Sequence, residues 1–353
     1  MNFKYRYSRY FYTRQVLVLV ALLASLSGCK KWYNIPEDKD YFSERLDYTV
    51  RTFSPVLGRT TVFTNIFNHD NSSLPLKFEM LNIRNPDGTP ADNLTKAQPT
   101  WVWKSAYTGE ELSLREIQDK RTKEEHPLWE LRKSGEFVLW QSATNELIPA
   151  YQGSATPGSY LFDVKVSNSG GEKTIKDLSF SPMREMAYDP ANRDAVTGLL
   201  KDSILPTELS GMIGQTTRKT LSNVAKDVYV YFRKVGNGSS LSFKFLNKDN
   251  TPIHTDAFED TKWSGLVHGF NMQRSPEAVR YDVAYPIPLV KRPTKYTTGD
   301  GSKASVEFSY NRLGFNGARE TGKIKLSFSI FQEGDWEIIF HFRNESPRFQ
   351  DDY

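Results

Sequence analysis

The stretch Val228-Tyr229-Val230-Tyr231-Phe232 consists entirely of β-branched and aromatic residues. These residue types favour the pleated backbone of a β-strand, and five residues is the length of a strand rather than of a helix. Four further stretches have a similar composition, and most of them alternate apolar with polar residues: 62–67, 162–166, 323–328 and 336–340. Alternation buries one face of a strand and exposes the other, as in antiparallel sandwiches. The sequence therefore predicts an all-β fold.

Turn signals and one charged stretch lie between these strands. Asn237-Gly238 and Ser169-Gly170-Gly171 are typical of tight turns in β-hairpins. The second of these turns predicts a hairpin between strands at 160–166 and 175–180. The charged stretch 110–133 predicts a short surface helix, around residues 112–123.

Several sequence features occur twice, in the same order. The heptapeptide Ser-Ser-Leu-Pro-Leu-Lys-Phe at 72–78 recurs as Ser-Ser-Leu-Ser-Phe-Lys-Phe at 239–245. Each copy follows an expected strand and precedes an Asp-x-Thr-Pro turn, at 87–90 and at 249–252. Chance similarity between hairpins is the alternative, but the shared order favours an internal duplication.

The duplication predicts two domains. A tryptophan follows each turn, and a glycine leads an aromatic residue into a late strand at 158–162 and again at 334–338. We therefore expect two tandem antiparallel β-sandwich domains of the immunoglobulin-like type, at 44–182 and 227–353. The connection at 183–226 is predicted to be partly helical. The second domain ends soon after its late strand, so its final strand is missing or is supplied differently.

The chain begins with a leader that ends at Cys29, its single cysteine. Four basic residues precede an apolar run at 16–26, which is the charge order of a secretory signal. The run is well short of the roughly 20 residues that a transmembrane helix needs. Leu26-Ser27-Gly28-Cys29 resembles the bacterial lipobox, and the resemblance implies that residues 1–28 are removed and that Cys29 is lipidated. An ordinary cleaved signal is the alternative.

The charge balance excludes one class of partner. The chain has 46 Lys and Arg against 42 Asp and Glu, and the leader carries four of the basic residues and no acid. Without the leader, the balance is 42 against 42. No basic footprint for nucleic acid remains. With Cys29 lipidated, the folded part has no thiol for disulfides or metal sites.

Residues 29–43 form a polar, lipid-anchored tether between the membrane and the first domain. Lysine rather than aspartate follows Cys29, so the inner-membrane retention signal of enterobacteria is absent. This favours the outer membrane. The acids of the tether begin only at Glu37, which leaves both the periplasmic and the surface face open.

The run Pro-Gly-x-Tyr-x-Phe-x-Val-x-Val at 157–166 resembles the late strand of immunoglobulin-like modules in bacterial surface proteins. Together with the lipobox, the tether and the two β modules, it makes the whole chain similar to an uncharacterised family of Bacteroidetes outer-membrane lipoproteins. That family is known only as a domain of unknown function, and some members are suspected near glycan-uptake loci. The resemblance implies a membrane-anchored protein and an outer-membrane transporter complex as a partner.

No catalytic residue, cofactor or metal site is predicted. The histidines show no paired helical spacing of the zinc-protease kind, and the chain has no Gly-x-Ser-x-Gly elbow or phosphate-binding glycine loop. His254 and Asp256 offer two metal ligands without a third. A binding protein is therefore favoured over an enzyme, and a carbohydrate-active enzyme is the less favoured alternative.

The stretch 263–274 mixes an indole ring with imidazole, amide and guanidinium groups and contains two glycines. Recognition of a sugar needs a ring to stack on and planar polar groups to bind hydroxyls. We expect Trp263 to be the stacking platform, and His268, Asn271 and Arg274 to hydrogen-bond an oligosaccharide. The competing interpretation is a loop that caps the sandwich with Trp263 buried.

Two classes of function follow from these observations. The first is a glycan-binding accessory lipoprotein of an outer-membrane uptake system. The second is a structural or assembly lipoprotein that docks on a membrane partner through sheet edges or loops.

The anchor is tested by replacing its single thiol. Cys29→Ala should abolish lipidation, because no other residue of the chain can take its place, and should leave the protein unprocessed or unanchored. Partitioning into the detergent phase, compared with that of the parent, measures the effect. Unchanged partitioning of the variant would overturn the lipobox interpretation.

Overall fold

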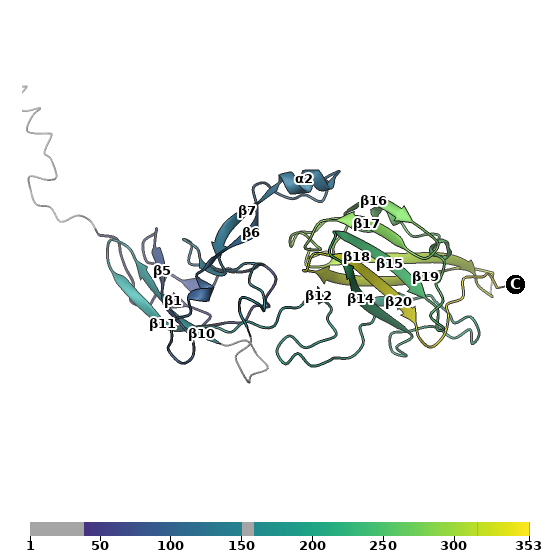
Figure 1. Cartoon of the computed structure of the whole chain (residues 1–353), viewed down its shortest axis with the longest axis horizontal. Coiled ribbons are helices and arrows are strands. Elements are labelled where there is room, and N and C mark those ends of the chain that lie inside the picture. The colour runs from purple at the N-terminus through teal and green to yellow at the C-terminus, as the bar shows by residue number, and fades with distance from the viewer. Residues whose placement is uncertain (1–38, 150–158, 316, 353) are drawn as a thin grey trace, which may run out of the picture.

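The computed structural model describes residues 39–149, 159–315 and 317–352. The leader, Cys29 and most of the predicted tether lie outside the described residues. The fold is all-β, as predicted, and consists of two β-sheet bodies placed end to end (Figure 1).

The first domain is a sandwich of a four-stranded and a three-stranded sheet. The larger sheet has the order β2 (Thr52–Phe53), β11 (Glu172–Phe180), β10 (Tyr160–Ser167), β5 (Lys77–Arg84). The smaller has the order β3 (Thr61–Phe63), β9 (Phe137–Leu139), β8 (Trp129–Leu131). A short ribbon pairs β1 (Asp47–Tyr48) with β4 (Phe67–Asn68). Antiparallel pairing of β10 with β11 confirms the predicted hairpin.

Aromatic rings from both sheets fill the core of this domain. Trp129 is fully buried and stacks on Phe137, with ring centroids 5.0 Å apart, and on Phe180 at 4.5 Å. Phe53 and Phe162 close the cluster from the larger sheet. Large flat side chains bury much apolar area each, which suits a sandwich of short strands.

The second domain has a five-stranded sheet with the order β14 (Val228–Gly236), β20 (Asp335–Phe342), β15 (Ser240–Leu246), β17 (Val279–Val283), β16 (Gly269–Arg274). The facing sheet is built on the long pair β18 (Ala304–Leu313) and β19 (Arg319–Ile330). Because β20 lies between β14 and β15, Asn237-Gly238 is not the hairpin turn that we predicted. It crosses the end of β20, where the Asp335 carboxylate accepts hydrogen bonds from Gly238 N and Ser240 Oγ.

The connection at 183–226 is not partly helical as predicted: the structure describes all of it and shows no helix there. At 194–200 the Asp194 carboxylate accepts the backbone N–H groups of Val196 and Thr197, which holds a turn in place of a helix. The connection instead supplies β12 (Tyr188–Asp189) and β13 (Glu208–Ser210), both paired with β19.

Most of the connection belongs to the second domain. Ile204, Met212 and Leu221 are buried in the core of that domain. The change of domain is sharp, because Met183 exchanges backbone hydrogen bonds with the first domain, whereas Ala187 O already accepts from Phe331 N in the second. We expected the final strand of the second domain to be missing or supplied differently. Strands β12 and β13 take its place, and both precede Val228, where the first strand of this domain was predicted to begin.

The internal repeat is real only over a short unit. In both copies an aspartate, Asp87 or Asp249, accepts two hydrogen bonds from the threonine two residues later, through its backbone N–H and its hydroxyl. A 3-10 helix follows each turn, η2 (Asp92–Leu94) and η3 (Thr255–Ala257). The wider correspondence was wrong, since β10 runs antiparallel to β5, whereas β20 runs parallel to β15.

The charged stretch 110–133 forms a helix that is shorter than predicted. Helix α2 (Leu114–Asp119) begins at Ser113, whose hydroxyl accepts the Glu116 N–H as an N-cap. The chain then enters strand β7 (Arg121–Pro127), which pairs with β6 (Ala97–Trp103). We call residues 97–127 the interdomain arm, because this ribbon reaches from the first domain towards the second (Figure 1).

These contacts make a prediction about fragments. Residues 186–353 should fold alone, whereas residues 227–353 should not, because they lose three buried side chains and the strands that cover the edge of β19. Removing each large buried side chain costs about 2–5 kcal/mol, and the cost of removing all three is comparable to the whole stability of a domain, about 5–15 kcal/mol. Circular dichroism melts of the two fragments measure this, and equal melting temperatures would contradict it.

Candidate functional site

Trp263 does not lie where the sequence led us to expect it. It begins the 3-10 helix η4 (Trp263–Gly265), is 6% exposed and packs in the core against Phe308, with ring centroids 5.6 Å apart. The Arg274 guanidinium lies 4.9 Å from its ring centroid, and the Tyr281 hydroxyl donates to its carbonyl. The ring is therefore part of the core and not an exposed stacking platform, which corrects our expectation.

His268 lies at the contact between the two domains. Its Nε2 is 2.8 Å from the Glu111 carbonyl oxygen, and its Nδ1 is hydrogen-bonded to the Tyr107 hydroxyl. Because a carbonyl can only accept, Nε2 carries the hydrogen, and Nδ1 accepts from the hydroxyl. The ring also stacks on Tyr296, with centroids 4.8 Å apart. His268 thus joins the arm to the second domain.

Asn271 and Arg274 lie on β16, at the edge of the larger sheet of the second domain. Asn271 is exposed, has a positive φ of 50° and donates from Nδ2 to the Asp282 carboxylate. Arg274 forms an ion pair with Asp256 at 2.6 Å. The four predicted residues therefore do not converge on one surface: Arg274 covers Trp263, whereas His268 and Asn271 point to other neighbours.

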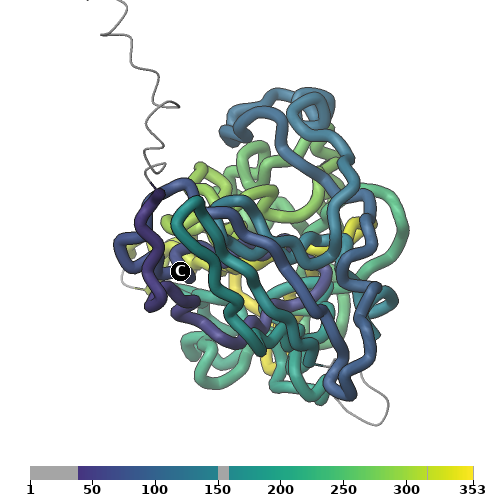
Figure 2. The backbone as a smooth tube through the Cα atoms, turned by 90° about the vertical axis from the view of Figure 1, so that its left-hand side faces the viewer, coloured from purple at the N-terminus to yellow at the C-terminus, as the bar shows by residue number. Residues whose placement is uncertain are grey.

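The interdomain arm docks on the second domain through a small apolar cluster and several polar contacts. Tyr107 and Ile117 of the arm pack with Ala284 and Leu289 of the second domain, and all four are buried. Figure 2 shows the arm running along one side of the molecule, with its helical tip beside strands of the second domain. Arg121 Nη1 donates to the Tyr285 carbonyl oxygen at 2.7 Å, which fixes the end of the ribbon next to α2.

Glu111 holds the tip of the arm in shape. Its buried carboxylate accepts the backbone N–H groups of Thr108 and Gly109 at 2.8 and 2.9 Å and pairs with Lys120. Burial alone would raise its pKa, but these hydrogen bonds outweigh burial and lower the pKa to about 2. The carbonyl of the same residue is the one that His268 contacts.

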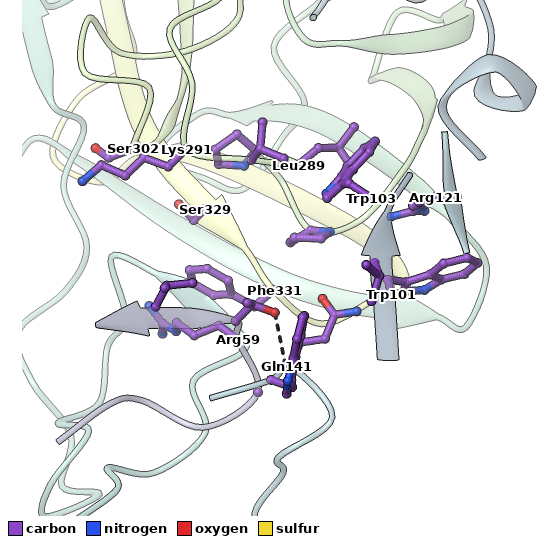
Figure 3. Close-up of a pocket in the computed structure, with 18 of the residues that line it drawn as sticks. Arg59, Trp101, Trp103, Arg121, Gln141, Leu289, Lys291, Ser302, Ser329 and Phe331 are labelled. Atoms are coloured by element: carbon purple, nitrogen blue, oxygen red, sulfur yellow. Dashed lines mark hydrogen bonds between the residues drawn. The ribbon is translucent and has the colours of Figure 1, made fainter. Parts of the chain in front are cut away.

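A groove of about 550 Å³ lies between the ribbon of the arm, the rest of the first domain and the second domain (Figure 3). Its first-domain side carries the rings of Trp101, Trp103 and Trp140. Its second-domain side is formed by a stretch with two prolines, 286–291, and by Phe331. The groove exists only where the two domains meet.

Two arginines that stack on aromatic rings place hydrogen-bond donors beside these apolar walls. Arg59 of the first domain lies 3.7 Å from the ring centroid of Phe331 of the second, and Arg121 lies 4.5 Å from that of Trp101. An arginine that stacks on a ring keeps its N–H groups available in the plane of the guanidinium. Gln141 and Ser329 add an amide and a hydroxyl. The groove therefore combines flat apolar surfaces with planar hydrogen-bond donors.

Our sequence analysis gave Trp101 and Trp103 no place in a binding site, although both are only partly buried and line the groove. The signal that identifies them is the charge of the partner strand β7, which presents Lys123 and Arg121 opposite the two rings. A two-stranded ribbon with such a strand has no core of its own to fill.

No group of three or more His, Cys, Asp or Glu side chains is placed to hold a metal ion in the described part of the chain. His254 Nδ1 does lie 3.1 Å from the Asp256 carboxylate. None of the helices in the described ranges is long and apolar enough to cross a membrane.

Comparison with known proteins identifies a family. The family model described as "Domain of unknown function (DUF5007)" matches residues 67–351. No curated protein matches the chain. The matched range takes in most of the first domain, the connection, the arm and the second domain, so the chain belongs to this family. The groove residues at 58–62 precede the matched range, and its other lining residues lie within it.

The acidity of Glu111 predicts how arm docking depends on pH. The pKa of the Glu111 carboxyl falls from 4.5 to about 2 on folding. The carboxylate therefore stabilises the folded protein fully above pH 4.5, and this contribution is lost as the pH falls towards 2. Glu111→Gln should lower the melting temperature by a few degrees at pH 7, and this difference should vanish near pH 2.

Glu110→Gln is the matched control, since Glu110 is exposed and pairs only with exposed Lys295. Its effect should be small at every pH. If Glu111→Gln lowered the melting temperature at pH 2 by as much as at pH 7, the assigned role of the Glu111 carboxylate would be contradicted.

Proposed function

We propose that this member of the DUF5007 family is a glycan-binding accessory lipoprotein of an outer-membrane uptake system, of the kind found in Bacteroidetes. In this proposal Cys29 carries the lipid, and the interdomain groove holds the oligosaccharide. The observation that carries the proposal is the convergence of two tryptophans, Trp101 and Trp103, with stacked guanidinium groups in one groove. The binding site moves from the 263–274 stretch to the groove, because Trp263 is buried.

The chemistry of the groove suits a saccharide better than a wholly apolar ligand. A sugar ring has an apolar face that stacks on an aromatic ring and an edge of hydroxyls that needs hydrogen-bond partners. The groove offers indole rings together with guanidinium, amide and hydroxyl groups. Its volume of about 550 Å³ lies within the range of about 300–1,000 Å³ that is typical of ligand sites.

One observation favours the second class, an assembly lipoprotein that docks on a membrane partner. The loop at 194–200 exposes Val196, Leu199 and Leu200, and each of the two leucines is 69% exposed. An apolar loop without converging polar groups is typical of a protein contact rather than of a sugar site. The two functions are compatible, because the loop and the groove share no lining residue.

A glycan array probed with residues 30–353 tests the proposal, and Trp101→Ala tests the site. A stacked ring contributes about 1–3 kcal/mol, by analogy with bases on aromatic side chains, so binding should weaken at least about tenfold. The melting temperature should change little, because Trp101 is only partly buried on a two-stranded ribbon.

Phe315→Ala is the matched control, because it also removes an aromatic ring, one that is 89% exposed and lies outside the groove. It should bind as the parent does. Undiminished binding by Trp101→Ala would remove the groove as the site, and an array without any bound glycan would favour the assembly function.

A further inference from the structure

We propose that the groove selects acidic saccharides, whose carboxylate or sulfate groups pair with the cationic side chains of its wall. This inference rests on the proposed function and names the class of its ligand.

The charges that line the groove all have one sign. Four cationic side chains face it: Arg59, Arg121 and Arg132 from the first domain and Lys291 from the second. No aspartate or glutamate is among the described residues that line it. Gathering like charges in a concave site bounded by apolar walls raises the local positive potential, and an anionic ligand is attracted to such a site.

Arg59 is the strongest single indication. Its guanidinium is stacked on Phe331, and its buried Nε has no hydrogen-bond partner among the described residues. Burial lowers its pKa, while Asp189 acts in the opposite direction. Asp189 itself forms an ion pair with Lys303 at 2.7 Å, so its charge is already shared. Arg59 therefore carries a positive charge without a carboxylate of its own.

Arg121 is oriented by neutral acceptors, and burial lowers its pKa, while the Glu333 carboxylate acts in the opposite direction. Its Nη1 donates to the Tyr285 carbonyl oxygen and its Nε to the Gln118 amide oxygen, and neither acceptor carries a charge. The side chain is 6% exposed. A buried cation that neutral acceptors orient is prepared to bind an anion at low entropic cost.

Arg132 and Lys291 are the two cations at the more open positions. Neither forms an ion pair with any carboxylate of the described residues. Arg132 lies 6.0 Å from the ring centroid of Trp140, and Lys291 is exposed. Because they come from different domains, one acidic oligosaccharide can contact both walls of the groove.

The experiment compares an acidic sugar with its neutral ester and with a second acidic sugar of a different kind. Isothermal titration calorimetry with residues 30–353 measures binding of tetragalacturonate, of its fully methyl-esterified form and of a sulfated galactan tetrasaccharide. We expect at least one acidic sugar to bind about tenfold or more tightly than the neutral ester. Raising the salt from 0.1 to 1 M shortens the Debye length from about 10 to about 3 Å and should weaken acidic binding alone.

Charge-removing variants locate the effect. Arg132→Gln and Lys291→Gln should each weaken binding of the acidic sugar about three- to tenfold and leave binding of the ester unchanged. Arg45→Gln and Lys219→Gln are matched controls that make the same change in net charge at exposed positions outside the groove, and they should have no effect.

The outcomes separate this inference from the proposed function. Equal, salt-independent binding of the ester and the acidic sugars overturns the inference and leaves the proposed function intact. A loss of acidic binding that is equal in the control variants also overturns it, because net charge and not the groove would then be responsible. Binding of no sugar by a protein with a normal melt overturns both. Tighter binding of tetragalacturonate identifies a carboxylate as the acidic group, and tighter binding of the galactan tetrasaccharide identifies a sulfate.

Discussion

Docking of the interdomain arm on the second domain is the constraint on which the rest of the structure depends. A two-stranded ribbon is at best marginally stable alone, so the position of β6 and β7 is set by what their tip contacts. The tip is held by the apolar cluster of Tyr107 and Ile117 and by the hydrogen bond between His268 and the Glu111 carbonyl. Without these contacts, Trp101 and Trp103 would lie on a free ribbon and the groove would have one wall.

Some residues that dock the arm on the second domain also line the groove, so the shape of the groove depends on how the two domains are arranged. Arg121 fixes the end of the ribbon next to α2 by its hydrogen bond to Tyr285 and also lines the groove. Leu289 packs in the docking cluster and lines the opposite wall. Arg59 and Phe331 form a cross-domain stack at the floor of the same space. A small change in the angle between the domains therefore changes the width of the groove and the distance between its cations.

The sequence predicted local features of the fold well and long-range pairing poorly. Alternation and turn chemistry identified the hairpin of β10 and β11, because the residues that decide it are neighbours in the chain. The same reasoning took Asn237-Gly238 for a hairpin turn, although β20, about a hundred residues later, lies between the two strands. The pairing of β12 with β19 spans a similar separation, and no local pattern of residues encodes it.

The candidate site was missed for a related physical reason. Trp101 lies between two β-branched residues, which predict a strand, and Trp263 precedes Ser264-Gly265, which predicts a loop, but neither pattern decides whether the ring is buried. What separates them is the element that carries each ring: η4 is packed against Phe308 in the core, whereas β6 belongs to a ribbon outside either core. Burial of an aromatic side chain is a property of the tertiary contacts, so composition alone favoured the wrong tryptophan.

A ligand held between two domains acts on their arrangement as well as on the site. Any molecule that binds the docked form in preference to the undocked form stabilises it by an amount that grows with its concentration above the dissociation constant. The cations on the two walls repel one another when the groove is empty, and an anionic bridge between Arg132 and Lys291 would convert that repulsion into attraction. Ligand binding and arm docking are therefore reciprocally coupled.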